Sequence, residues 1–203
     1  MASVHDAIVA AMAEQLERRR HWDEPPALYW LHLERGRPKL RQVGIPDLMW
    51  ALDRPPAVLG RIAVTMAAGR YRSPWPDLFG MAVRHEGWKV EVDPTLPGAK
   101  ATSRRAAAQS REHTLHTRPD RIEARMFYAV DRAGWTYQAE QKRGQLRAER
   151  MAVPPASDPT ITGAVVDALD LMVATMLGVT LPERVEPPAE WVGEEPTTKE
   201  RKP

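Results

Sequence analysis

Two segments of the sequence share one pattern, in which apolar and charged residues alternate on both sides of a Gly-Trp pair. The first pair is Gly87-Trp88 and the second is Gly134-Trp135. A period of two places alternate side chains on opposite faces of a β-strand, and glycine readily adopts the left-handed conformation that closes a short turn. Each segment is therefore predicted to form an antiparallel hairpin, with its Trp as the first inward residue of the returning strand. Gly36 marks a third hairpin.

Helical signals separate these hairpins. Ser3 and Asp6 form a capping-box pattern before an apolar repeat at helical spacing. Residues 53–69 open with two prolines and close on a glycine, as helices often do. A short helical turn is expected within 45–52, and a last apolar helix over 160–178.

The order of these elements predicts an α+β fold. Three hairpins or so would form one antiparallel meander sheet, with N-terminal, central and C-terminal helices packed mainly on one face. The almost wholly apolar strand at 28–33 further indicates that both of its own faces are covered. We expect a single domain over 1–182, a basic insert at 99–117 that is either helix or loop, and a disordered acidic, Pro-rich tail at 183–203.

Composition excludes some chemistry and predicts a compartment. Cysteine is absent, so disulfides, thiolate zinc sites and Cys nucleophiles are excluded. Arg outnumbers Lys 23 to 6 and asparagine is absent, which is typical of a GC-rich genome. No stretch approaches the roughly 20 apolar residues of a membrane span, and the first residues do not follow the signal-peptide pattern. We therefore expect a cytoplasmic protein that does not bind membranes.

Positive charge is concentrated in the middle of the chain. Residues 100–150 contain twelve Lys and Arg against six Asp and Glu. Such a region attracts anions, although interleaved acids also indicate a solvated, self-paired surface. Arg104, Arg105 and Arg111 are the candidate anion-binding residues, because almost no apolar residues surround them in the sequence.

Familiar catalytic motifs are missing from the sequence. It lacks the phosphate-loop, dinucleotide-binding, nucleophile-elbow and zincin patterns. The nearest approach to a metal site is "EHTLHTRPD", where His113, His116 and Asp120 could supply ligands. Two histidines in a basic segment are more often ordinary surface residues, so we predict no bound metal or cofactor.

Acidic residues elsewhere have ordinary explanations. Glu123 and Glu140 alternate with apolar residues beside Arg125 and Lys142, which indicates cross-strand ion pairs. The carboxylates of residues 167 and 170 lie off the apolar stripe of the last helix and are expected to be solvated.

Aromatic residues suggest a binding surface. Seven Trp residues are many for this length, and Trp is enriched at interaction hot spots. Trp75 stands between two prolines in a predicted loop and is a candidate partner-binding residue, unless it folds back as a lid on the core. Phe127 falls on the polar face of its strand beside Arg125, which makes it a second candidate contact.

Three segments carry a resemblance to other proteins. They are "DEPPALYWLHLE", "RPPAVL" and "HTRPDRIEARMFYAVDRAGWTYQAEQKRG". Together they resemble a group of small α+β proteins of unassigned function from GC-rich bacteria and their phages, over nearly all of the chain except the tail. The resemblance implies no activity and no catalytic residue. The alternation of helices and antiparallel strands is also similar to secretion-chaperone-like domains, as an analogy of fold alone.

Three functions are consistent with these observations. The leading hypothesis is a non-enzymatic protein-interaction or chaperone-like accessory protein of a phage or mobile element. The alternative is a nucleic-acid-binding protein that uses the basic 100–150 region. The third hypothesis is a metal-dependent hydrolase around His113 and His116.

Overall fold

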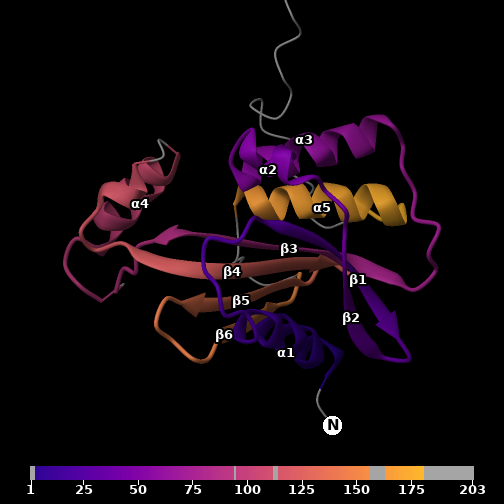
Figure 1. Cartoon of the computed structure of the whole chain (residues 1–203), viewed down its shortest axis with the longest axis horizontal. Coiled ribbons are helices and arrows are strands. Elements are labelled where there is room, and N and C mark those ends of the chain that lie inside the picture. The colour runs from indigo at the N-terminus through magenta and orange to yellow at the C-terminus, as the bar shows by residue number, and fades with distance from the viewer. Residues whose placement is uncertain (1–2, 94, 112–113, 156–162, 181–203) are drawn as a thin grey trace, which may run out of the picture.

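The computed structural model describes residues 3–93, 95–111, 114–155 and 163–180. Within them the chain forms helices and one six-stranded antiparallel sheet, which confirms the predicted α+β class (Figure 1). The strands are β1 (Ala27–Glu34), β2 (Arg37–Gln42), β3 (Leu78–Lys89), β4 (Ile122–Asp131), β5 (Thr136–Lys142) and β6 (Glu149–Val153). The helices are α1 (Val4–Glu17), α2 (Asp47–Ala51), α3 (Pro55–Ala68), α4 (Ala99–Arg111), the 3-10 turn η1 (Leu115–Thr117) and α5 (Ala164–Leu177).

The strands lie in the order β2-β1-β3-β4-β5-β6, and every neighbouring pair is antiparallel. Three hairpins build this sheet: β1–β2, β4–β5 and β5–β6. Their turns contain Gly36, Gly134 and Gly144, with φ of 75°, 83° and 90°, which is the left-handed region where glycine avoids the steric cost of a Cβ atom. The predicted turns at Gly36 and Gly134 are confirmed.

The predicted hairpin at Gly87 is wrong. β3 runs unbroken through this residue, which is paired with Ala124 of β4 and has no left-handed φ. β3 and β4 are neighbours, but the chain between them passes through α4 and η1. The Gly-Trp pair of β3 therefore serves another purpose than turning the chain.

Helices cover both faces of the sheet (Figure 1). α3 and α5 pack together on one face, with α2 beside them, while α1 covers the opposite face. The helices were expected mainly on one face of the sheet. This is correct for α2, α3 and α5, whereas α1 lies on the other face. The apolar strand β1 lies between the two layers, as its sequence predicts: Leu28 packs toward α3 and α5, and Tyr29 packs toward α1.

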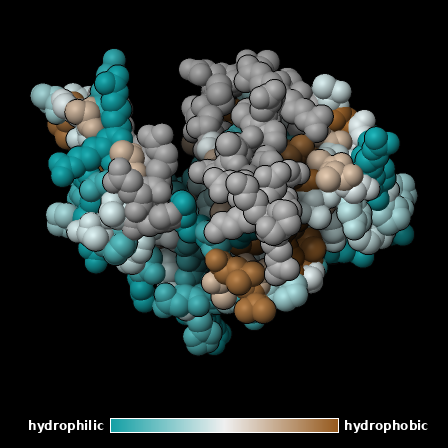
Figure 2. Space-filling model, turned by 90° about the horizontal axis from the view of Figure 1, so that it is seen from above, coloured by the Kyte–Doolittle hydropathy of each residue, from teal (hydrophilic) through white to brown (hydrophobic). Residues whose placement is uncertain are grey.

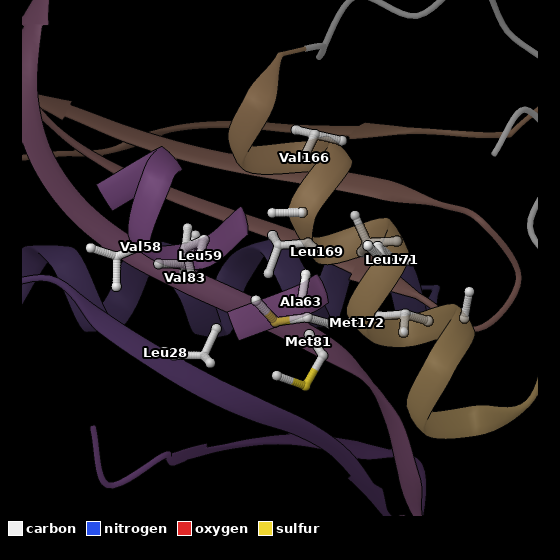
Figure 3. Packing of buried hydrophobic residues seen from close by; sticks show 14 of the residues in the cluster. Leu28, Val58, Leu59, Ala63, Met81, Val83, Val166, Leu169, Leu171 and Met172 are labelled. Carbon is white, nitrogen blue, oxygen red and sulfur yellow. The ribbon is translucent and has the colours of Figure 1, made fainter. Parts of the chain in front are cut away.

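Figure 3 shows the larger core, between the sheet and the α3–α5 layer. Leu169 and Met172 of α5 meet Ala63 of α3 and Met81 of β3, and all four side chains are fully buried. Burying a Leu or Met side chain completely stabilises the fold by roughly 1.5–3 kcal/mol. This packing fixes the helical layer on the sheet.

The N-terminal helix has the cap that its sequence predicts. The Ser3 hydroxyl accepts a hydrogen bond from the Asp6 backbone N–H at 3.1 Å, and the Asp6 carboxylate accepts one from the Ser3 N–H at 3.0 Å. This reciprocal pairing satisfies two backbone donors that a helix start leaves free. A hydrogen bond that the Ser3 hydroxyl donates to the Asp6 carboxylate at 2.9 Å, together with that from the Ser3 N–H, lowers the pKa of Asp6.

The basic insert is a helix. α4 stands apart from α2, α3 and α5 (Figure 1). It is tied to η1 by hydrogen bonds to Gln109, whose carbonyl accepts from the Thr114 N–H and whose side chain accepts from Arg118. The expected disordered tail at 183–203 lies outside the described residues.

Candidate functional site

A cleft of about 440 Å³ opens between α2, the end of β3 and the loop that joins α1 to β1. This volume falls in the range of small-ligand sites. We call it the acidic cleft, because five carboxylate residues and two tryptophans contribute to its walls. Its lining residues are Asp23, Glu24, Pro25, Pro26, Asp47, Trp50, Ala51, Glu86, Gly87, Trp88 and Glu123.

The loop wall of the cleft is shaped by Asp23. This residue has a φ of 65°, an uncommon left-handed conformation for a residue with a side chain. Its backbone N–H donates a hydrogen bond to the Glu86 carboxylate at 2.6 Å. That bond anchors the loop against the end of β3 and leaves the Asp23 side chain exposed at the cleft.

Beneath the cleft lies a buried arginine. Arg125 is 1% exposed, and its Nε donates to the Glu86 carboxylate at 2.8 Å. Its Nη1 donates to the Arg19 carbonyl at 3.0 Å, and its guanidinium lies 4.3 Å from the ring centroid of Trp22. Stacking on an aromatic face is a favourable environment for a guanidinium. Glu86 is thereby held in one position.

A second buried arginine supports the neighbouring carboxylate. Arg84 donates from Nη2 to the Pro25 carbonyl at 2.9 Å, and its Nη1 lies 3.3 Å from the Glu24 carboxylate. Glu24 is also paired with Arg19. Two carboxylates of the cleft wall are therefore fixed from below by cations that water does not reach. A charge pair of this kind holds a defined geometry, since removing either partner leaves an uncompensated buried charge.

Two carboxylates of the cleft have no such partner. Asp23 and Asp47 are exposed, and within the described chain neither forms an ion pair. By contrast Glu123 is paired with Arg143, and Glu86 with Arg125. The cleft therefore presents two exposed carboxylates that form no ion pair among the described residues, although Arg143 interacts electrostatically with Asp23, and such carboxylates favour a cationic ligand.

The tryptophans form the apolar part of the cleft. Trp50 of α2 is buried, whereas Trp88 of β3 is 39% exposed, although it was expected in the core. The guanidinium of Arg121 lies 5.0 Å from the Trp88 ring, so this ring already has a cation as neighbour. Leu48 of α2 and Leu52, which follows this helix, are also exposed, by 71% and 67%.

A metal ion fits this cluster poorly. Carboxylate oxygens of Asp23, Glu86 and Glu123 lie within 4.8 Å of one another, which is close enough to share an ion. However, Glu86 and Glu123 are each paired with an arginine. A metal ion would be repelled by those guanidinium groups unless it displaced them. An organic cation that pairs with the exposed Asp23 or Asp47 leaves both of these arginine pairs in place.

Trp75 is half exposed, in agreement with its position between two prolines. Its ring lies 5.4 Å from that of Trp30 and 5.8 Å from that of His32, and its exposed fraction is 43%. Both interpretations from the sequence, an exposed anchor and a lid on the core, therefore apply in part: one side of the ring contacts the body of the protein and the other is open. It lies outside the acidic cleft.

Phe127 is not a surface residue. It is fully buried beneath α1, where its ring lies 5.1 Å from that of Tyr29. The sequence interpretation was wrong because Arg125, two residues away on the same face, was taken to mark a polar surface. Arg125 is itself buried, with its charge balanced by Glu86.

The predicted cross-strand ion pairs have different partners. Glu140 is largely buried and pairs with Lys89 at 2.6 Å. Lys142 lies 2.5 Å from Glu91 and 3.1 Å from Glu149, and these carboxylates raise its pKa. Glu123 meets Arg143 rather than Lys142. The acids were correctly assigned to ion pairs, but Glu140 reaches across β4 to a residue of β3, an arrangement that the sequence does not reveal.

The candidate anion-binding residues belong to α4. The side chains of Arg104 and Arg105 are exposed, as predicted, whereas the side chain of Arg111 is outside what the structure describes. Seen from above, the side of the molecule on which α4 projects is mostly hydrophilic (Figures 1 and 2). α4 thus presents positive charge on a projecting element.

The candidate metal ligands are not brought together in the described residues. His113 lies outside them, and His116 is exposed on η1. Asp120 accepts two hydrogen bonds from Arg118, at 2.7 and 2.6 Å, which lower its pKa. This carboxylate already has a cationic partner.

The acidic cleft was not predicted from the sequence. Its acids come from the α1–β1 loop, α2, β3 and β4, so no local motif contains them. One signal was present: a glycine within a strand often marks a place where a ligand or another backbone approaches closely, and Gly87 is such a residue.

No protein-family model, curated protein or solved structure matches this chain. Among the described residues, no helix combines the length and apolar character needed to cross a membrane. The functional argument therefore rests on the geometry of the surface itself.

Proposed function

We propose that this protein is a non-enzymatic protein-interaction module, and that its docking site is the acidic cleft. The observation that carries the proposal is that one cleft contains two carboxylates without an ion-pair partner, Asp23 and Asp47, together with two tryptophans. Carboxylates attract a Lys or Arg side chain, and an indole face adds a cation–π contact of about 0.5–2 kcal/mol. The exposed Leu48 and Leu52 beside the cleft supply apolar contact area for a protein partner.

The walls of the cleft favour recognition rather than catalysis. Glu86 and Glu24 are held by the buried Arg125 and Arg84, so their oxygens are committed to ion pairs. A site whose geometry is fixed before binding loses little conformational entropy when the partner docks. These features support a role in binding, such as that of a chaperone-like accessory protein.

A direct test uses N-acetylarginine amide as the probe, with N-acetylglutamine amide as the uncharged comparison. The arginine probe should change the indole signals of Trp50 and Trp88 in nuclear magnetic resonance spectra, with an effect that weakens as salt rises. The double variant Asp23→Asn/Asp47→Asn should lose at least three-quarters of the response. The control variant Glu14→Gln/Asp93→Asn removes the same charge outside the cleft and should respond like the wild type. Equal responses to both probes, or an unaffected Asp23→Asn/Asp47→Asn variant, would overturn the proposal.

The basic helix favours a second function. Arg104 and Arg105 are exposed on a helix that projects from the body, which is a geometry suited to phosphate contacts. Nucleic-acid binding by α4 is therefore the alternative proposal, and it makes a different prediction about salt and about which residues matter.

A further inference from the structure

The end of β3 is a free sheet edge. β1 begins at Ala27, opposite Arg84, but β3 continues to Lys89 with β4 as its only neighbouring strand among the described residues, and the loop at Asp23 contacts it through the Glu86 side chain. The residues that would extend β1 along this edge are Pro25 and Pro26. Proline has no backbone N–H to donate to a neighbouring strand, so the β1–β3 ladder ends here.

Alternation along the strands shows which backbone groups this edge presents. The Val43 N–H donates to the Leu28 carbonyl at 2.8 Å, so the backbone of Leu28 faces β2 and that of Ala27 faces β3. The partner of Ala27, Arg84, therefore faces β1. Backbone direction repeats every second residue along a strand, so the N–H and C=O groups of Glu86 and Trp88 point to the same side as those of Arg84. Beyond Ala27 that side is open.

These groups lie in the wall of the acidic cleft. Glu86 and Trp88 both line it, and so does Gly87, which has only backbone to contribute. Among the described residues, no backbone hydrogen bond is directed to Glu86 or Trp88 from this side; the His85 ring lies 3.4 Å from the Glu86 carbonyl. The cleft thus combines negative charge with an unpaired strand edge.

We propose that a partner docks by adding an extended basic segment to this edge, antiparallel to β3. The inference rests on the proposed function of the acidic cleft and specifies how the partner is held. In an antiparallel pair, directly opposite side chains project from the same face of the sheet. The residue opposite Glu86 would therefore lie beside the Glu86 carboxylate and near that of Asp23, whose oxygens lie within 4.8 Å of one another, and the residue opposite Trp88 would lie against its indole ring.

The same geometry defines the sequence of the partner segment. Its residue opposite Gly87 would project from the other face, where the Met126 methyl group lies over the glycine, 3.2 Å from the position of a Cβ atom. An apolar side chain fits that position, because it covers the glycine backbone and faces the side of the sheet on which α2 lies. The predicted recognition sequence is a basic residue, an apolar residue and a second basic residue.

Synthetic peptides test this mode of binding. The probe is acetyl-Thr-Arg-Leu-Arg-Thr-amide, whose two arginine N–H groups should bond to β3 while the leucine N–H points away. We expect the amide signals of Glu86 and Trp88 to shift on binding. Methylating both arginine backbone nitrogens should weaken binding at least tenfold, whereas methylating the leucine nitrogen should weaken it less than threefold.

The outcomes separate the two proposals. If both methylated peptides bind like the parent, strand addition is wrong while cation recognition stands. If the parent binds no better than acetyl-Thr-Gln-Leu-Gln-Thr-amide, cation recognition by the cleft is wrong as well. Shifts confined to residues outside β3, with tight binding, would also overturn strand addition.

Discussion

The acidic cleft and helix α4 carry opposite charges, and they differ most in what lies beneath them. In the cleft, the carboxylates of Glu24 and Glu86 are each held by an arginine that is almost fully buried. On α4, Arg104 and Arg105 are exposed side chains on a helix that stands apart from the helical layer.

This difference bears on how each surface would bind. Charges fixed by buried partners define directions and distances, which favours recognition of one particular ligand geometry. Exposed charges on a projecting helix attract any anion of suitable size and are screened by salt. The comparison therefore predicts that the cleft contributes to both stability and specificity, whereas α4 contributes to neither.

The largest expected effect comes from breaking the support of the cleft. Glu86→Ala leaves the Arg125 guanidinium buried without a carboxylate, and losing one partner of a buried pair costs about 3–5 kcal/mol of unfolding free energy. Urea denaturation measures the loss. The exposed Glu14→Ala should change stability by less than about 0.5 kcal/mol.

A double variant keeps this prediction testable if Glu86→Ala does not fold. Glu86→Met/Arg125→Met replaces the ion pair with apolar side chains and should recover most of the stability, because no buried charge remains. A loss of less than about 1 kcal/mol in Glu86→Ala would show that the cleft wall is not held by this pair.

Asp170 of α5, which was expected to be solvated, is instead partly buried and gives the next effect. Burial, and then the neighbouring Asp167, raise the pKa of Asp170 from 3.8 to about 7. The folded state therefore favours the protonated acid, and its stability falls as pH rises from about 4 to about 7. Asp170→Asn should abolish this loss and be more stable than the wild type at pH 8, by roughly 2–4 kcal/mol.

Comparing Asp170→Asn with the wild type also cancels the contribution of His85, which changes the pH dependence of stability in the opposite direction. Burial lowers the pKa of His85 from 6.5 to about 4, so that this residue destabilises the fold as pH falls from about 6.5 toward 4. Both proteins carry His85, and its effect cancels in the difference. A stability difference that does not change between pH 4 and 8 would contradict the raised pKa of Asp170.

The sequence predicted the parts of the fold that depend on neighbouring residues. The Ser3 cap and the Gly134 turn are local, because their hydrogen bonds or φ values involve residues a few positions apart. The pattern around Gly87 is almost the same as that around Gly134, yet Gly87 lies within a strand. What differs is the partner of each strand, and the sequence pattern alone does not specify it.

The site depends still more on distant contacts. Phe127 and Arg125 were placed outside because charged residues usually mark a solvated face, but α1 covers that face and Glu86 balances the charge. The cleft acids were missed because Asp23 and Glu123 are brought together only when β3 and β4 pair and the loop folds against them. The pair Pro25-Pro26 and the glycine at 87 were the local signs of an interrupted edge.

A smaller effect should separate Trp75 from the cleft. Trp75→Ala removes its contacts with Trp30 and His32, which should cost about 1 kcal/mol of unfolding free energy. Response to the arginine probe should remain as in the wild type, because Trp75 does not line the cleft. Lost peptide binding with unchanged stability would instead identify Trp75 as a partner-binding anchor.

The smallest expected effect concerns α4, and it decides between the two proposed functions. Arg104→Ala/Arg105→Ala should leave the melting temperature within about 1 °C of the wild type, since both side chains are exposed. Phosphate contacts make affinity fall steeply with salt, so binding to mixed DNA and RNA fragments is measured at about 50 and 200 mM salt. We expect the wild type not to bind at either concentration, because nearby acids such as Asp120 and Glu123 are interleaved with the bases of this region. Salt-dependent binding that the double variant loses would reverse the order of the two functions, and would make α4, rather than the acidic cleft, the principal binding surface.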